Sequence, residues 1–338
     1  MSARAVFTLA VALCVLAPAA PRVTRGEARR AGPSPAAVQR PGAQGRTFQA
    51  PPLTAEARRD LEAKLDAARR AYERNPSDAD AVIWLGRRTA YLGRFEEAIA
   101  VFTEGITKHP EDARLYRHRG HRYLTLRQFD LAVKDLERAA KLIRGRPDET
   151  EPDGLPNARN IPTSTLHSNV WYHLGLAHYL RGDFGKALRA YRECLKFSNN
   201  PDMLAATAHW LYMTLRRMKR HDEARQILAL VRDDADIIEN REYQRLLLMY
   251  KGTLEPERLL SEAAKQQGSL GFATTAYGVG NWYLYHGDRD RARTVFLRVV
   301  AGPQQTSFGY IAAEAELRRM GVPVSLPPPT MPTRVIYE

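Results

Sequence analysis

The sequence predicts an all-α solenoid built from stacked helix-turn-helix hairpins, and three observations support this. Two stretches within residues 79–142 repeat each other at an offset of 34 positions, so that Gly86 matches Gly120 and Ala98 matches Ala132. Apolar and small residues recur in both stretches at three- and four-residue steps, as they do in amphipathic helices. A single hairpin of this size cannot bury its apolar face alone, so a series of them indicates a stack.

Each hairpin is predicted to pair two helices through a short turn. In the first, Gly93 can adopt the left-handed conformation that ends a helix at little cost. Small residues such as Gly86 allow two helix backbones to approach closely, and aromatic residues fill the space beside them. We therefore expect Ala98, Ala132 and Ala187 to be buried between paired helices.

The remaining elements follow in order. Thr54 is a plausible helix cap, and the apolar stripe Leu61, Leu65, Ala68 and Tyr72 predicts a helix that covers the start of the stack. Later, Pro256 fits a first helical position, and a terminal helix with a polar outer face is expected. The predicted solenoid spans residues 54–321, with hairpins at 79–112, 113–146, 168–201, 205–235, 237–267 and 273–302 and a terminal helix at 306–320.

An insertion interrupts the repeat. The spacing from Gly120 to Gly175 exceeds the repeat length, and the extra segment at 145–165 is rich in proline and acidic residues. Long connections without helical pattern are uncommon in compact domains and are often functional or mobile. The insertion is therefore either a tolerated surface loop or a functional segment, and the sequence leaves open whether it covers a groove.

The hairpins resemble the tetratricopeptide repeat family, and the chain resembles a bacterial, secreted member of it. The resemblance covers residues 54–321 and implies a right-handed superhelix that binds partner proteins. It carries over no catalytic residue and no cofactor. The residues that match the family pattern are Leu85, Gly86, Gly93, Phe95 and Ala98 in one hairpin and Trp171, Leu174, Gly175, Gly182, Phe184, Ala187 and Tyr191 in another.

The two ends differ from the repeats in composition. Residues 1–19 read as a signal peptide, with a basic start, an apolar run and a small-residue cleavage pattern at Ala17–Ala19. A retained membrane anchor is the alternative, although the run is short for a span. Residues 20–53 are expected to be a disordered linker and 322–338 an extended proline-rich tail. We therefore expect an exported protein, periplasmic or secreted, with no membrane span in the mature chain.

Charge and cysteine content restrict the function further. Residues 1–53 hold seven arginines and one glutamate, which leaves +7 of the formal +13 for the rest of the chain. Much of the basic excess therefore lies in a tail, which makes nucleic acid an unlikely partner. Loss of Cys14 with the signal segment leaves Cys194 alone, without an intrachain disulfide, and we interpret Cys194 as a buried packing thiol.

In the family that this chain resembles, the first helices line a concave groove. We predict a non-catalytic scaffold whose groove binds an extended or acidic peptide segment of another protein, with arginines and histidines at one end and tyrosines further along. The alternative is that these residues are solvated faces and packing aromatics. The predicted groove residues are Arg87, Tyr91, Arg117, His118, His121, Tyr172, Tyr179, His209, Tyr277, Asn281 and Tyr285.

Two other functions stay open. One is an enzyme with a site between the insertion and the groove, using His167, His173 and Glu193. The other is a binder of an anionic polymer, a glycan or nucleic acid, through the basic tail and the groove. The histidines lack HExxH, paired CxxC or carboxylates at ligand spacing, so no metal site is predicted, and no cofactor motif is present.

Overall fold

The computed structural model describes residues 53–324, and these contain fourteen α-helices and no β-strand. The predicted all-α solenoid is confirmed. The predicted signal peptide at 1–19, Cys14, and nearly all of the predicted linker and tail lie outside the described residues.

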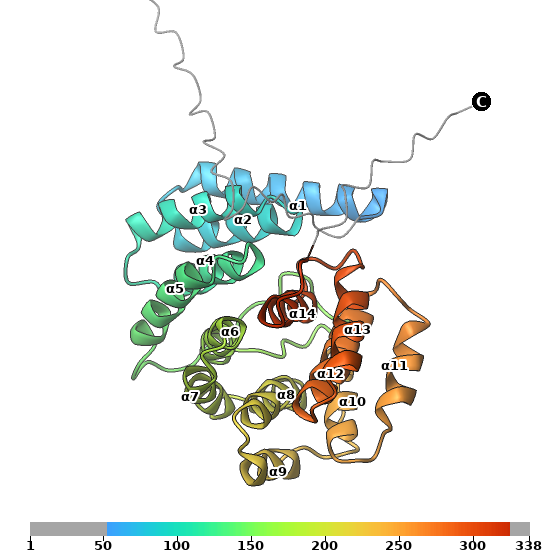
Figure 1. Ribbon diagram of the computed structural model, residues 1–338. Coiled ribbons are helices and arrows are strands. Elements are labelled where there is room, and N and C mark those ends of the chain that lie inside the picture. Colours follow the sequence, from blue (N-terminus) through green and yellow to red (C-terminus); the bar gives the residue numbers. More distant parts are fainter. Residues whose placement is uncertain (1–52, 325–338) are drawn as a thin grey trace, which may run out of the picture. The chain divides into compact units, whose positions relative to one another are not determined.

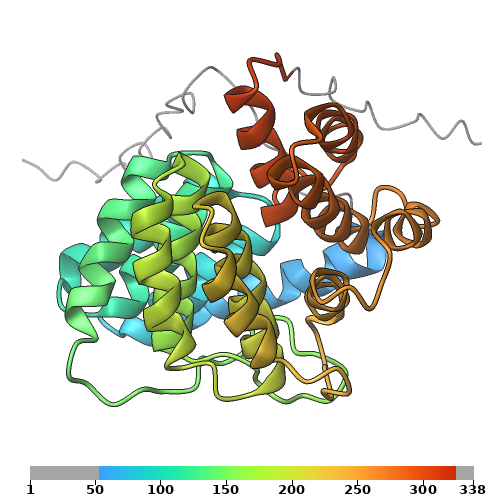
Figure 2. The ribbon, with the colours of Figure 1, turned by 60° about the horizontal axis from the view of Figure 1, so that its bottom comes forward.

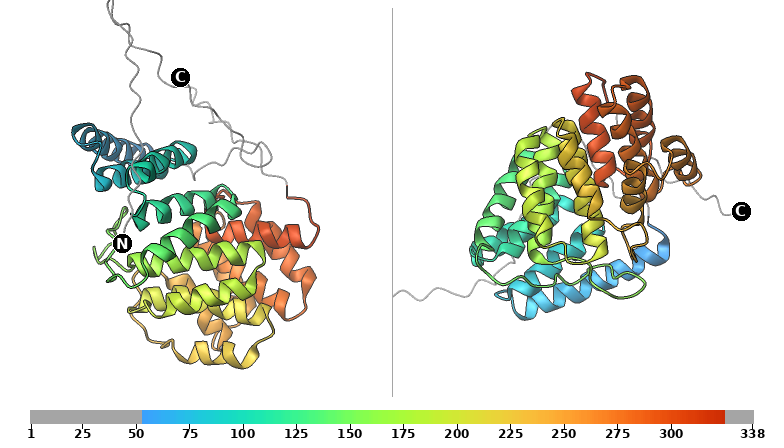
Figure 3. Two further views of the ribbon diagram at one scale, coloured as in Figure 1. Left: turned by 90° about the vertical axis from the view of Figure 1, so that its left-hand side faces the viewer. Right: turned by 90° about the horizontal axis from the view of Figure 1, so that it is seen from below.

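Six helical hairpins follow a first single helix and precede a last one, each packing on the next along the chain (Figures 1 and 3). The helices are α1 (Ala55–Arg74), α2 (Ala79–Tyr91), α3 (Phe95–Lys108), α4 (Ala113–Thr125), α5 (Phe129–Leu142), α6 (Leu166–Arg181), α7 (Phe184–Leu195), α8 (Pro201–Arg217), α9 (His221–Ala229), α10 (Arg241–Tyr250), α11 (Pro256–Ala264), α12 (Leu270–Tyr285), α13 (Arg289–Val300) and α14 (Phe308–Arg319).

Helix α1 covers the start of the stack by packing against α2. Thr54 caps it as predicted, because its side chain accepts a hydrogen bond of 3.1 Å from the backbone N–H of Ala57. The predicted apolar stripe faces inward, and its residues Leu61, Leu65 and Ala68 are buried.

The two helices of a hairpin touch through a glycine and a large side chain. A Cβ atom added at Gly86 would lie 2.4 Å from the ring of Phe102, and one at Gly175 would lie 2.6 Å from the ring of Tyr191. Two further pairs, Gly120 with Leu136 and Gly280 with Phe296, repeat this contact at the same sequence separation. Ala98, Ala132 and Ala187 are fully buried, as expected. Each glycine therefore lets a large residue of the second helix lie directly on the first helix.

The hairpin turns need a left-handed residue, and the second and fourth hairpins have Arg127 and Lys219 there in place of glycine. Gly93 has φ 79° in the first turn, as predicted, whereas the matching position in the second turn is Arg127 with φ 59°. This conformation is costly for a residue with a side chain. The Arg127 guanidinium donates to the carbonyl of Gln305 (2.7 Å) and to the Glu314 carboxylate (3.0 Å), and these bonds offset the cost.

The terminal helix α14 corrects one expectation. It was predicted to carry a polar outer face, but most of its side chains are buried because it packs against α12, α13 and α6 (Figure 1). Its carboxylates are paired inside: Glu316 accepts from Arg217 at 2.7 Å. At its end, Arg319 donates to the carbonyl of Tyr179 at 3.0 Å. The last helix therefore fills space against α6 and does not form a solvent-facing cap.

One histidine in this interior is an acid-sensitive group. His209 is fully buried on α8 between Tyr243 and Tyr250, with ring centroids at 4.7 and 5.8 Å. Burial lowers the pKa of His209 to about 3 from an ordinary value of 6.5. The folded protein therefore keeps this imidazole neutral at pH values where the unfolded chain protonates it.

The glycine contact predicts opposite effects for two alanine substitutions. Gly175→Ala should lower the free energy of unfolding by about 1–3 kcal/mol, because the new methyl group overlaps the buried Tyr191 ring. Gly185→Ala, on the exposed face of α7 with no atom within 4 Å of the added Cβ, should raise it by about 0.5–1 kcal/mol. Urea unfolding of both variants measures this, and equal stabilities would contradict the proposed contact.

The environment of His209 predicts a loss of stability in acid. Below about pH 6.5 the His209 imidazole is protonated in the unfolded chain, whereas in the native protein it stays neutral down to about pH 3. The free energy of unfolding should therefore fall with decreasing pH by up to about 1.4 kcal/mol per pH unit from this residue alone. His209→Phe should flatten the slope between pH 6 and 4.5 in urea titrations. His221→Phe, at an exposed position, is the matched control, and parallel slopes for wild type and His209→Phe would refute the assignment.

Candidate functional site

The arginines predicted for one end of the groove lie on α2 and α4 and meet the insertion. Arg87 and Arg117 are 8% exposed, and segment 151–154 of the insertion lies against them. Arg87 donates to the carbonyl of Pro152 at 2.7 Å. Arg88, which is not among the predicted groove residues, donates to the carbonyl of Gly154 at 2.7 Å. The insertion therefore covers the arginine–histidine end of the predicted groove, which the sequence had left open.

Glu151 is the centre of this contact. One carboxylate oxygen lies 3.1 Å from the guanidinium of Arg117 and 3.8 Å from Nε2 of His118. The other accepts a hydrogen bond from the Asn169 amide at 3.1 Å. The Glu151 side chain is only 10% exposed, so its charge is held almost entirely by protein groups. The guanidinium and the amide both donate to the carboxylate, so together they form a specific binding site for an acid.

Gly154 fits against the ring of Tyr91. A Cβ atom added at Gly154 would lie 1.7 Å from the Tyr91 hydroxyl, so no side chain fits there while Tyr91 keeps its position. The site therefore binds one carboxylate and two backbone carbonyls. Three positions after the residue that carries the carboxylate, it has room only for a residue without a side chain. We call this set, formed by Arg87, Arg88, Tyr91, Arg117, His118 and Asn169, the arginine site.

Burial fixes the charge states of the arginine site. Desolvation lowers the pKa of His118 well below its usual value, and the guanidinium of Arg117 adds to this effect. Desolvation likewise lowers the pKa of His121, so both imidazoles are neutral at pH 7. Burial lowers the pKa of Arg122 to about 10, which leaves it charged. Arg122 and Arg117 line a cavity of about 190 Å³ beside Glu151, so positive charge outweighs negative charge there.

The two limbs of the insertion are attached differently. Near its base, Glu151 N–H donates to the carbonyl of Ser164 at 3.1 Å, which forms a short antiparallel contact. Asn157, near the middle of the insertion, and Thr163, beside Ser164, both bond to Glu239, at 2.7 and 2.8 Å. Figure 2 shows the insertion running beneath α6 and α8 toward the linker that follows α9. The insertion is therefore a bridge between hairpins and not a loop held only at its base.

The tyrosine end of the predicted groove is filled by the chain itself. Tyr179 is fully buried and accepts a hydrogen bond of 2.9 Å from the hydroxyl of Tyr277. Tyr172 lies 3.3 Å from the hydroxyl of Tyr243. Asn281 is also fully buried, and the guanidinium of Arg216 lies 4.4 Å from the ring centre of Tyr285. We expected Tyr172, Tyr179, His209, Tyr277 and Asn281 to face an open groove, but they are buried because α10, α12 and α14 pack on α6 and α8.

The residues considered for an enzyme are not brought together. His167 and Glu193 line a groove between α5 and α7. His173 faces the other way, where its ring lies 4.5 Å from that of His121 and 5.7 Å from that of Phe308. Burial raises the pKa of Cys194 to about 12, so this thiol is unreactive and packs in the core.

Within residues 53–324, no cluster of three or more histidine, cysteine or acidic side chains has the geometry to hold a metal ion. The helices of the same range are all too short or too polar to cross a bilayer.

Sequence reasoning missed Glu151, Arg88 and Asn169 as members of the site. The available signal was the opposite charge of two segments: an acidic insertion and an arginine-rich pair of first helices. It also missed the groove between α5 and α7, because the cations that line this groove come from three separate segments that only packing brings together.

Known proteins share parts of this chain. Residues 53–113, 85–149 and 168–201 match the tetratricopeptide repeat family. The BBSome complex member BBS4 of Bos taurus is 27% identical over 141 residues, which is 42% of this chain and 23% of that protein. The corresponding protein of Mus musculus is 25% identical over 139 residues, 41% of this chain and 22% of that protein. The chain thus spans less than a quarter of the length of these relatives.

Solved structures are more distant in sequence. YrrB, described as a tetratricopeptide repeat protein with an unusual peptide-binding site, has 16% identity and a TM-score of 0.41, and the match covers 75% of this chain and 98% of YrrB. The Cut9–Hcn1 hetero-tetramer of the APC/C has 16% identity and a TM-score of 0.44, with 78% of this chain and 40% of that chain covered. From the helical hairpins and the family matches, we conclude that residues 53–149 and 168–201 form tetratricopeptide repeats.

Proposed function

We propose that this protein–protein interaction scaffold is non-catalytic and binds an extended, acidic segment of a partner protein at the arginine site. The observation that carries the proposal is the chain's own segment 151–154, which occupies the site through one carboxylate and two backbone carbonyls. A partner segment of the same chemistry competes for the same donors.

The chemistry of the arginine site favours a peptide over a small acid. Arg87 and Arg88 donate to main-chain carbonyls, which every extended peptide offers at regular spacing. Arg117 and Asn169 supply the donors for one carboxylate. The Tyr91 hydroxyl leaves no room for a side chain three residues later unless Tyr91 moves, which favours glycine there. The partner segment is therefore predicted to carry an acidic residue followed, three positions on, by glycine.

Binding in trans must displace the insertion. The two-limb attachment leaves the bonds to Glu239 in place when segment 151–154 leaves the site, because Asn157 and Thr163 lie outside that segment. A partner can bind only to molecules in which the insertion has left the site. The apparent association constant is therefore the intrinsic constant multiplied by the fraction of molecules with a free site. The insertion thus sets the partner concentration at which binding begins.

Two further points belong to this proposal. We propose export of the protein, on the basis of the signal-peptide pattern in residues 1–19. The enzyme alternative has less support, because His173 lies apart from His167 and Glu193.

The proposal predicts that a free peptide binds once the internal competitor is removed. In the full chain, residues 150–155 are replaced by a glycine–serine linker of equal length. A fluorescent peptide that copies residues 148–157 should bind this variant about tenfold or more tightly than it binds the unaltered chain, because an intramolecular segment acts at high effective concentration. Fluorescence anisotropy measures both dissociation constants, and circular dichroism checks the helical content of the variant.

Adding Arg117→Ala to the linker variant should weaken binding by about 2 kcal/mol or more, because a nearly buried charge contact is lost. Arg225→Ala, an exposed arginine 73% accessible to solvent, is the matched control and should leave binding unchanged. Equal affinity for a peptide in which the glutamate corresponding to Glu151 is glutamine would refute recognition of the carboxylate.

A further inference from the structure

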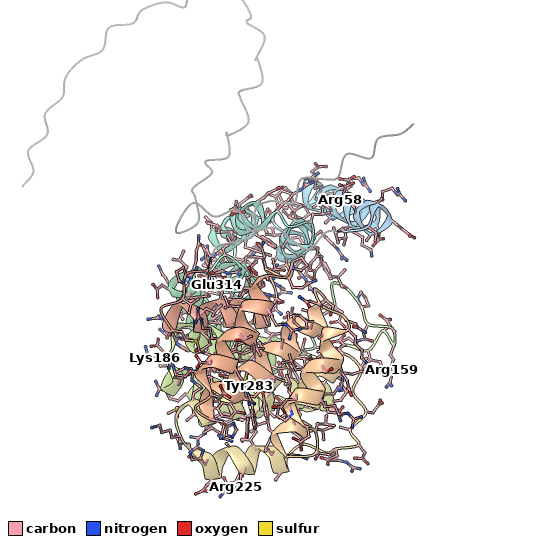
Figure 4. The ribbon with its side chains drawn as sticks, turned by 45° about the vertical axis from the view of Figure 1, so that its right-hand side comes forward. Arg58, Arg159, Lys186, Arg225, Tyr283 and Glu314 are labelled. Carbon is pink, nitrogen blue, oxygen red and sulfur yellow. The ribbon has the colours of Figure 1, made fainter. Side chains whose placement is uncertain are left out.

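The protein has a second surface groove, apart from the arginine site. A groove of about 1000 Å³ lies between α5 and α7 and reaches down to α6. Trp171, Leu174 and Phe197 contribute apolar surface to it. Lys186, on the rim of this groove, and Arg159, in the insertion, appear at opposite edges of the molecule in Figure 4. We call this surface the basic groove.

Arg192, which lines the basic groove, pairs with Glu223, but five other cations of the groove have no ion-pair partner among the described residues. Lys141, Arg144, Arg146, Lys186 and Arg189 are exposed, and none forms an ion pair with any residue of the part that the structure describes. Many arginines elsewhere in this part are paired with carboxylates, Arg119 with Asp135 among them. Unpaired positive charges on three adjacent segments repel one another, which raises the electrostatic free energy of the unbound protein. Binding of an acidic ligand lowers this free energy.

The floor of the basic groove contains an unsatisfied polar atom. His167 is 5% exposed, its ring packs edge-on against Phe197 at 4.7 Å, and its Nε2 has no hydrogen-bond partner. A buried polar atom without a partner is unfavourable, and a ligand group that bonds to it removes that penalty. Trp171 and Phe197 are only partly buried, so apolar surface is available beside this atom.

We propose that the basic groove is a second docking surface, for an acidic segment of a partner protein that carries a large apolar side chain. The apolar side chain enters between Trp171, Leu174 and Phe197, and the flanking carboxylates pair with Lys141, Arg144 and Arg189. The positive charge of the groove favours an acidic partner, and its apolar floor favours a partner segment that also carries a large apolar side chain.

A protein segment fits this groove better than nucleic acid does. Glu137 and Glu193 line the same groove among the cations. A phosphate backbone presents negative charge at every step and would approach these carboxylates, whereas a peptide can place uncharged residues opposite them. Because none of these residues belongs to the arginine site, the two surfaces allow one chain to hold two partner segments at once.

The test uses the full chain and four labelled probes: an acidic peptide with one central phenylalanine, the same peptide with alanine at the centre, polyglutamate, and an oligothymidylate. The phenylalanine peptide should bind about tenfold more tightly than the alanine peptide or polyglutamate, because the apolar floor contributes. Arg144→Glu with Arg189→Glu should weaken it about tenfold or more, since two attractions become repulsions. Fluorescence anisotropy at fixed salt gives each dissociation constant.

Two controls separate this proposal from the arginine site and from general charge effects. Arg225→Glu with Arg258→Glu makes the same charge change at exposed positions away from the groove and should leave binding unchanged. Arg117→Ala should also leave it unchanged, whereas it weakens a ligand of the arginine site. Equal binding of the phenylalanine and alanine peptides, equal loss in the control pair, tighter binding of oligothymidylate, or no peptide binding would each overturn the proposal.

Discussion

The fold depends on close contact between a glycine of one helix and a large side chain of its hairpin partner. The contact recurs in four hairpins with the same spacing, although the large residue is Phe102, Leu136, Tyr191 or Phe296. A glycine in the middle of a helix is locally unfavourable, so its presence at these positions reflects the packing that it permits. Because the contact sets how the two helices lie against each other, it also sets which side chains of the first helices face the interior.

That interior is where the chain departs from an open repeat array. In a simple solenoid each repeat contacts its neighbours alone, and the inner face of the first helices is free for ligands. Here α10, α12 and α14 cover the first helices of the third and fourth hairpins, and the insertion covers those of the first two. The two surfaces proposed for partners are a site already occupied by an internal segment and the basic groove on another side of the helices.

The sequence predicted the local features well because they arise from contacts close along the chain. The Thr54 cap, the left-handed Gly93 and the buried Ala98, Ala132 and Ala187 follow from helix periodicity and turn chemistry. The candidate site was harder to predict. Their position in the repeat predicts a groove for Tyr179 and Asn281, but both are buried by contacts between distant parts of the chain. Tyr277 bonds to Tyr179 across 98 positions, and Arg217 bonds to Asn281 across 64.

The pairing of Arg127 with Glu314 joins residues separated by 187 positions. Most helical repeats need only neighbouring units, so they can form one after another as the polypeptide emerges. In this chain Arg127, in the turn of the second hairpin, has one local bond, to the carbonyl of Thr125. Its bonds to Gln305 and Glu314 form only after synthesis has reached α14. Completion of the native state therefore requires α14. A chain cut short before it lacks both long-range bonds of Arg127 and the helix that covers part of the interior.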